Sequence, residues 1–199
     1  LFTECIKSTQ REGLIHSFFS ERAITKIPEL ASGKPVELKN IGIIGGGTMG
    51  TGISMAAMNA GYNVIMIEQN QGAIDKALEK INSTYERNVK LGRITSNQKQ
   101  QIMNLFSATT DMKELNNRDL IIEAVFENME VKKEVFIKLN DICNKSCILA
   151  SNTSYLDVNE ITTVVDNPSR VIGLHFFSPA NIMKLLEVVV ADKTSEDTV

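Results

Sequence analysis

The pattern of apolar and polar positions changes near Lys39. Before that point, apolar residues recur at three- and four-residue steps over residues 1–27, with charged residues between them, which predicts an amphipathic helix. No strand follows closely enough to cover the apolar face of this helix, so we expect it to pack on another part of the protein. Residues 28–35 contain two prolines and a glycine and are interpreted as a linker.

From Lys39 onward, short apolar runs alternate with longer amphipathic segments. The runs that predict strands are 40–46, 63–68, 107–110, 119–125, 147–151, 170–175 and 185–190. The segments that predict helices are 48–60, 71–91, 96–105, 129–143 and 157–165. Nearly continuous apolar strands separated by helices indicate an α/β fold with a doubly wound, mostly parallel sheet of the Rossmann type, covered on both faces. We therefore divide the chain into a linker region, 1–38, and an α/β domain, 39–199.

The composition is that of an ordinary globular protein. The 199 residues are 43% hydrophobic, with 21 basic and 24 acidic side chains and a formal net charge of −3. This balance offers no basic surface to nucleic acid, and no window approaches the roughly 18 uninterrupted apolar residues of a membrane span. Three cysteines without CxxC spacing are interpreted as free thiols in a reducing compartment, with neither a disulfide framework nor a metal site.

A glycine-rich loop joins the first predicted strand to the first predicted helix. Gly45-Gly46-Gly47-Thr48-Met49-Gly50 matches the pattern GxGxxG. In this motif the first glycine permits a tight turn, the second lets the backbone approach a pyrophosphate, and the third lets the helix pack close to the sheet. The helix N-terminus then offers unpaired N–H groups to phosphates. A dinucleotide site is favoured over a plain glycine turn.

An acidic residue ends the second predicted strand. Glu68 lies 18 residues beyond Gly50, near the spacing expected for an acid that binds the adenosine ribose. Its carboxylate would accept hydrogen bonds from a ribose hydroxyl and repel a 2′-phosphate. Gln69 and Asn70 follow, rather than an arginine. The pattern therefore favours NAD over NADP.

Polar residues also follow the late strands, at the edge where doubly wound folds bind ligands. Ser154 comes after the fifth predicted strand, His175 ends the sixth, and Glu187 lies within an apolar stretch. A reversal at Pro179 would bring His175 and Glu187 together. A buried Glu beside a His fixes the tautomer and raises the basicity of the ring, as a general base for an alcohol proton requires. From spacing alone, a structural histidine is an equally good interpretation.

Two charged residues flank the turn after the fourth predicted strand. Glu127 is interpreted, from its position alone, as an acid near a helix N-terminus. Lys132 begins a charged run, 132–134, which is interpreted as a solvated helix face.

Five ordered motifs together resemble the NAD-binding domain of L-3-hydroxyacyl-CoA dehydrogenases. They are residues 41–50, 123–128, 151–154, 173–179 and 183–188. Residues 1–28 are similar to the helix that joins the enoyl-CoA hydratase and dehydrogenase parts of peroxisomal-type multifunctional β-oxidation enzymes. Ser178 also resembles that branch, because monofunctional relatives have Asn in its place.

The resemblance implies a role for each of these residues. His175 matches the catalytic base, Glu187 its partner, and Ser154 the serine that holds the substrate hydroxyl. The positions that match the cofactor site are Gly45, Gly47, Thr48, Met49, Gly50, Glu68, Ala124, Glu127, Lys132 and Asn152. Lys90 is a candidate for contact with the CoA tail. The implied reaction moves a hydride from C3 of an L-3-hydroxyacyl-CoA to NAD⁺, giving a 3-ketoacyl-CoA and NADH.

The resemblance also implies further parts and partners. Both chain ends look cut from something longer, and family members continue into a second, helical domain that supports subunit contacts in a homo-oligomer. A peroxisomal location is expected, with mitochondrion and cytoplasm left open, and whether a hydratase domain precedes residue 1 also stays open. We expect the isolated chain to bind NAD(H) but to oxidise acyl-CoA substrates poorly.

Two other functions stay open at this point. One is a non-catalytic NAD-binding or structural protein of the lens-crystallin kind, and the intact His175, Glu187 and Ser154 argue against it. The other is a dehydrogenase of small hydroxy acids, against which the spacing from His175 to Glu187 and the adjacent phenylalanines argue.

Overall fold

The computed structural model describes residues 2–24, 27 and 32–199, and residues 1, 25–26 and 28–31 of the predicted helix and linker lie outside them. The N-terminal region forms two helices, α1 (Phe2–Ile6) and α2 (Thr9–Ala23), where the sequence predicts one. The break falls at Ser8, whose side chain accepts a hydrogen bond from the N–H of Arg11 at 3.2 Å and so begins a new helix.

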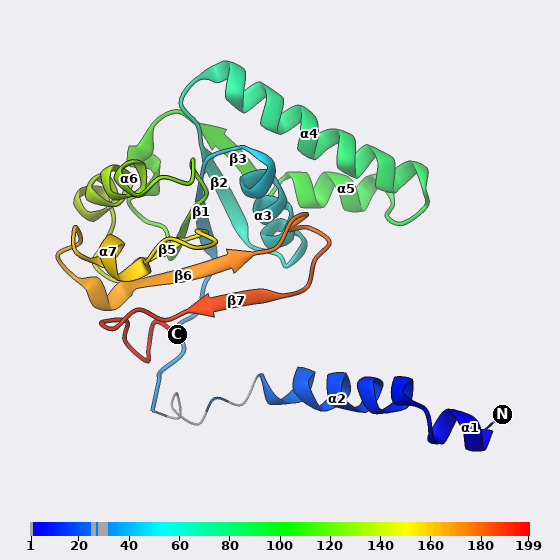
Figure 1. Ribbon diagram of the computed structural model, residues 1–199. Helices are drawn as coiled ribbons and strands as arrows, with labels where there is room; N and C mark the ends of the chain where they lie inside the picture. Colours follow the sequence, from blue (N-terminus) through cyan, green and yellow to red (C-terminus); the bar gives the residue numbers. More distant parts are fainter. Residues whose placement is uncertain (1, 25–26, 28–31) are drawn as a thin grey trace.

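The apolar residues of α1 and α2 remain exposed. Leu14, Phe18 and Phe19 are 73%, 50% and 63% exposed, and neither helix contains a buried residue. Figure 1 shows both helices set apart from the sheet. The predicted packing of this region on another part of the protein is therefore not found within the described residues.

The remaining chain forms one seven-stranded sheet in the order β3-β2-β1-β4-β5-β6-β7. Its strands are β1 (Asn40–Ile44), β2 (Asn63–Ile67), β3 (Phe106–Thr109), β4 (Leu120–Glu123), β5 (Ile148–Ser151), β6 (Val171–Phe176) and β7 (Leu186–Val189). The first six strands are parallel, and β7 pairs antiparallel with β6. The strand order reverses between β1 and β4, which places the ligand-binding switch point of a doubly wound fold there.

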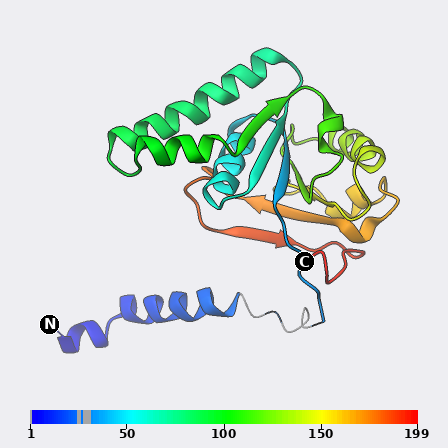
Figure 2. The ribbon, with the colours of Figure 1, turned by 180° about the vertical axis from the view of Figure 1, so that it is seen from behind.

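Helices lie on both faces of the sheet (Figures 1 and 2). The helices α3 (Thr48–Asn59), α4 (Gln71–Lys90) and α5 (Ser96–Met103) pack on one side, and α6 (Met129–Ile142) and α7 (Val158–Thr162) on the other. Two short 3₁₀ turns, η2 (Met112–Leu115) and η3 (Pro168–Arg170), were not predicted. Each face has its own core, centred on residues such as Ile43 and Ile81 or Phe136 and Leu149.

Helices cover both faces as predicted, but among the described residues the cover is incomplete near β6 and β7. An apolar pocket of about 420 Å³ opens beside α3 and is lined by Ile122, Ile172 and Leu174, among others. On β7, Leu186 and Val188 are 38% and 44% exposed.

Among the described residues, no helix combines the length and the apolar composition that a membrane span requires.

Candidate functional site

The glycine loop between β1 and α3 has a geometry that only glycine permits at two positions. Gly45 has φ +97°, and a Cβ on it would lie 2.7 Å from the carbonyl oxygen of Ala124. A Cβ on Gly50 would lie 1.7 Å from the carbonyl oxygen of Gly45. At these two positions the loop and the first turn of α3 are thus packed too tightly for a side chain, as the sequence predicts.

Gly47 differs, because it faces open space. A Cβ on Gly47 would meet no atom within 4 Å, and Gly47 and Thr48 are both exposed. Gly47 is the N-cap of α3 and supplies no side-chain cap, so the first N–H groups of the helix remain available to an anion. This arrangement fits the pyrophosphate of a dinucleotide.

Glu68 lies directly beside this loop, at the end of β2. One carboxylate oxygen accepts a hydrogen bond from the N–H of Gly46, and the other accepts one from the N–H of Gln69 at 3.0 Å. The acid is therefore anchored to the glycine loop, at the position that binds an adenosine ribose in this fold.

A pocket of about 440 Å³ opens near the carboxyl ends of the central strands. It is lined by Met49, Ala124, Val125, Glu127, Asn152, Ser154, His175, Phe176, Phe177 and Ser178. Six of the predicted site residues are in this wall, drawn from segments far apart in the chain. Val125, Phe176 and Phe177 were not predicted as site residues, because their apolar side chains give no polar signal in the sequence.

His175 and Glu187 face each other across the antiparallel pair β6 and β7. They occupy the same register position, and His175 Nδ1 lies 2.7 Å from Glu187 Oε2. The ring of Phe177 packs against the imidazole with centroids 4.6 Å apart. With Nδ1–H donating to the carboxylate, Nε2 is left as the acceptor that a general base needs.

The expectation of a buried Glu187 is wrong for the described chain. The Glu187 side chain is 53% exposed, whereas the His175 side chain is 19% exposed. The physical reason is that β7 is the edge strand and all four of its residues are exposed. The apolar neighbours of Glu187 in the sequence suggested burial, but no described residue covers them.

Ser154 and Asn152 are fixed at the end of β5. The backbone N–H and Oγ of Ser154 lie 2.8 Å and 3.3 Å from Glu127 Oε1. Asn152 Oδ1 accepts a hydrogen bond from the N–H of Phe176 at 2.9 Å, which leaves the Asn152 amide group as a donor. Asn152 thus ties the β5 end to the β6 end next to His175.

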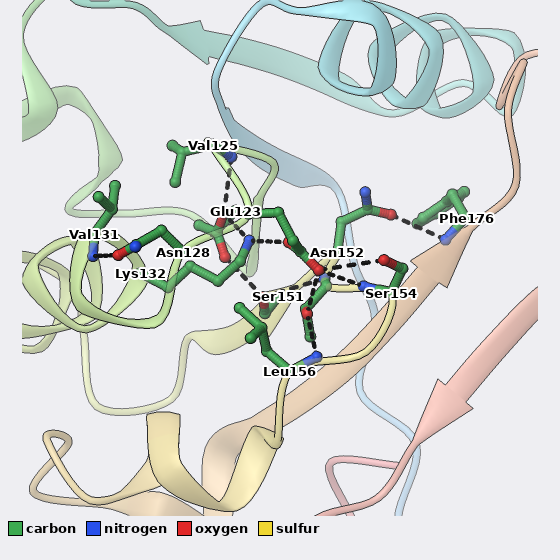
Figure 3. Close-up of polar contacts among 12 residues, drawn as sticks. Glu123, Val125, Asn128, Val131, Lys132, Ser151, Asn152, Ser154, Leu156 and Phe176 are labelled. Carbon is green, nitrogen blue, oxygen red and sulfur yellow. Dashed lines mark hydrogen bonds and ion pairs between the residues drawn. The ribbon is translucent and has the colours of Figure 1, made fainter.

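Lys132 is buried, which corrects its interpretation as part of a solvated helix face. Its side chain is 1% exposed, and Nζ lies 2.8 Å from Glu123 Oε1 and 3.1 Å from Glu127 Oε2. Figure 3 shows the contact of this ammonium with Glu123 and the nearby Ser151. A buried ammonium persists because carboxylates surround it. Lys132 is absent from the lining of the pocket itself.

Glu123 is the residue that the sequence analysis missed. It ends β4, is 0% exposed, and contacts Lys132, Ser151 and the N–H of Val125. Its signal was available, because a glutamate that ends the apolar run Leu120-Ile121-Ile122 needs a partner if the run is buried.

Glu127 is held as a carboxylate by its neighbours. Partial burial on its own raises its pKa, but hydrogen bonds from Thr153, Ser154 and Lys132, together with the Lys132 charge, outweigh burial and leave the pKa below its ordinary value. Glu127 therefore presents negative charge at the pocket wall next to Ser154.

Comparison with known proteins places this geometry in a family. Residues 40–199 match the family model described as "3-hydroxyacyl-CoA dehydrogenase, NAD binding domain". A peroxisomal fatty acid beta-oxidation multifunctional protein of Arabidopsis thaliana is 35% identical over 100% of this chain and 28% of its own length. A 3-hydroxybutyryl-CoA dehydrogenase of Clostridioides difficile is 40% identical over 79% of this chain and 56% of its own length.

A solved structure gives the same result. The crystal structure of 3-hydroxybutyryl-CoA dehydrogenase from Escherichia coli superposes with a TM-score of 0.80 at 34% identity, covering 82% of this chain and 34% of that one. The chain spans about 28% of the length of the multifunctional relative from Arabidopsis. Its match over residues 40–199 shows that the chain belongs to the 3-hydroxyacyl-CoA dehydrogenase family, of which it carries the NAD-binding domain.

Proposed function

We propose that the protein containing this chain is an oxidoreductase of fatty acid β-oxidation, which oxidises an L-3-hydroxyacyl-CoA to a 3-ketoacyl-CoA with NAD⁺. The observation that carries the proposal is the 2.7 Å contact of His175 with Glu187, at a pocket that also contains Ser154 and Met49 of the glycine-loop helix. A base, a polar anchor and the start of a dinucleotide site thus share one cavity. This combination supports alcohol oxidation.

In the proposed mechanism the side chains of this chain move one proton and position one oxygen. Ser154 Oγ, whose hydrogen points to Glu127 Oε1 in the free chain, turns it to the 3-hydroxyl oxygen of the substrate, and His175 Nε2 takes the hydroxyl proton. The Glu187 carboxylate, on Nδ1, holds the ring and stabilises the imidazolium that forms. The hydride leaves C3 as the C–O bond becomes a carbonyl, and bound NAD⁺ supplies the hydride acceptor.

The residues present fit NAD at two places. Gly45, Gly47, Thr48, Met49 and Gly50 would hold the pyrophosphate at the N-terminus of α3, and the Glu68 carboxylate would accept hydrogen bonds from the adenosine ribose and disfavour a 2′-phosphate. The nicotinamide half would lie against the pocket wall formed by Ala124, Glu127 and Asn152, with Lys132 holding Glu127 through an ion pair.

Another pocket, separate from the two described above, has a lining that would bind an anionic substrate tail. It measures about 370 Å³ and is lined by Arg87 and Arg93 together with Asn181 and Ile182, among others. Ser178, a few residues before Asn181, lines the pocket that contains Ser154 and His175. We propose that the phosphates of CoA lie along Arg87 and Arg93. Lys90, the candidate from the sequence, is exposed and is not part of this lining.

The relatives support a larger assembly for the whole protein. Multifunctional relatives from plants are described as peroxisomal or glyoxysomal, and we propose a peroxisomal location. We also propose that residues 1–38 form a linker and residues 39–199 the NAD-binding domain. The exposed apolar residues of α2, Leu14, Phe18 and Phe19, would then contact another domain of the same protein.

The experiment compares substrates in the full-length protein. L-3-hydroxybutyryl-CoA and free L-3-hydroxybutyrate are each supplied with NAD⁺, and NADH formation is followed by absorbance. Because binding energy from the CoA portion is used to reach the transition state, we expect kcat/KM to be at least about a hundredfold higher for the CoA ester. Equal rates would indicate a dehydrogenase of small hydroxy acids. NADH binding without turnover of either compound would indicate a non-catalytic protein.

A further inference from the structure

Glu123 is a buried charged residue that is not part of the lining of the pocket that contains Ser154 and His175. Glu123 ends β4 and is 0% exposed. Both of its carboxylate oxygens receive donors: Oε1 from Lys132 Nζ at 2.8 Å and from the N–H of Val125 at 2.8 Å, and Oε2 from Ser151 Oγ at 2.7 Å. Glu123 therefore links three segments of the chain at one point.

Lys132 connects Glu123 to Glu127. It lies in the first turns of α6, where the helix dipole disfavours a positive charge, so its ammonium depends on the carboxylates around it. Nζ bridges Glu123 and Glu127, at 2.8 Å and 3.1 Å. The bridge fixes one oxygen of Glu127 and leaves the other, Oε1, for different donors.

Glu127 Oε1 holds the segment that carries Ser154. It accepts hydrogen bonds from Thr153 Oγ1 at 2.6 Å, from the N–H of Ser154 at 2.8 Å and from Ser154 Oγ at 3.3 Å. At the other end of this segment, Ser151 Oγ donates to Glu123. Glu123 thus fixes the segment at both ends, directly at Ser151 and through Lys132 and Glu127 at Ser154. Figure 3 shows Glu123 between Lys132 and Ser151.

We propose that Glu123 is a positioning residue of this pocket: through the buried ion pair with Lys132 it holds Glu127 where Glu127 orients Ser154 in the pocket that also contains His175. The proposal rests on the proposed function for the meaning of that orientation. Without the Glu123 charge, Glu127 becomes the sole anion for the Lys132 ammonium. Glu127 is then drawn toward Lys132, and its bonds to the Ser154 segment weaken.

The first test uses the full-length protein and needs no activity. Glu123→Gln keeps the shape of the side chain and removes its charge. Hydrogen–deuterium exchange is compared in peptides covering residues 151–156, where the N–H groups of Thr153, Ser154 and Leu156 bond within this network. We expect faster exchange there and unchanged exchange in β2. The control is Glu160→Gln, which removes the exposed ion pair of the neighbouring Lys133 and is expected to alter neither readout.

The second test is a double-mutant cycle on turnover. Because small misplacement of a reacting group is costly, we expect Glu123→Gln to lower kcat about ten- to a hundredfold with little change in the Kd for NADH. If Glu123 acts through Ser154, adding Ser154→Ala to Glu123→Gln lowers kcat no further than Ser154→Ala alone. Losses that multiply, or exchange that stays unchanged over residues 151–156, would overturn the proposal. A wild-type protein that does not oxidise the CoA ester sinks the proposed function but leaves the exchange test in force.

A further variant separates positioning from stability. Glu123→Gln combined with Lys132→Met removes both buried charges, and such replacements often preserve folding. We expect this double variant to fold even if Glu123→Gln alone does not, to show fast exchange over residues 151–156, and to retain low kcat. Wild-type kcat in the double variant would show that the ion pair does not position Ser154.

Discussion

The Glu187 carboxylate lies 2.7 Å from Nδ1 of His175, across the antiparallel strand pair at the edge of the sheet. This contact selects the ring nitrogen that remains free for a substrate proton. In the full-length protein, Glu187→Gln should lower kcat for the CoA ester about ten- to a hundredfold, because the amide does not stabilise an imidazolium as a carboxylate does. NADH affinity should not change. Steady-state kinetics and NADH fluorescence titration provide the two measurements, and a changed NADH affinity with intact kcat would contradict this role.

The glycine loop gives a matched pair of substitutions. Gly50→Ala places a methyl group 1.7 Å from a carbonyl oxygen and should lower the free energy of unfolding by about 3 kcal/mol, the upper range for overpacking. Gly47→Ala meets no atom within 4 Å, so folding should be unaffected while NADH binds about tenfold more weakly. Chemical unfolding and NADH titration distinguish the two effects. A stable Gly47→Ala protein with normal NADH affinity would place the pyrophosphate elsewhere.

Glu68 provides a test of cofactor preference. Glu68→Gln removes the charge and keeps an oxygen that can accept the hydrogen bond from the N–H of Gly46. Because the negative charge no longer repels a 2′-phosphate, we expect the ratio of kcat/KM for NAD⁺ to that for NADP⁺ to fall by about tenfold. An unchanged ratio would mean that Glu68 does not face the ribose.

The lowered pKa of Glu127 leads to a pH dependence of stability. A folded-state pKa below the unfolded value gives stabilisation that is present above the unfolded pKa, near 4.3, and is lost as pH falls through the folded value. The wild-type protein should therefore be more stable than Glu127→Gln at about pH 6, and the difference should shrink toward about pH 3. Urea unfolding at several pH values measures this difference, with Glu160→Gln as the control. A pH-independent difference would contradict the ionised state of Glu127.

Much of the fold was predictable because the strands and helices have different apolar periods. The order of strands and helices from Asn40 to Val189 agrees with the prediction to within a few residues at each boundary. The sequence also indicated that His175 would meet Glu187 if the chain reversed at Pro179, and the antiparallel pairing of β6 with β7 confirms that arrangement.

Whether the charged residues Lys132 and Glu187 are buried was harder to predict from the sequence. Lys132 follows the solvated pattern of its neighbours in α6, and its burial depends on Glu123, which lies nine positions earlier in another element. Glu187 shows the opposite error, because its apolar neighbours suggested burial that no described residue provides. The burial of Lys132 depends on a contact with another element, and the exposure of Glu187 depends on the edge position of β7 in the sheet. Local periodicity reports neither.

Oxidation of L-3-hydroxybutyryl-CoA by the full-length protein and its His175→Gln variant tests the central claim most directly. The account predicts that wild-type protein forms NADH and that His175→Gln lowers kcat by about a hundredfold or more, while NADH binds both proteins equally in fluorescence titration. Turnover by His175→Gln at the wild-type rate would contradict the assignment of His175 as the base.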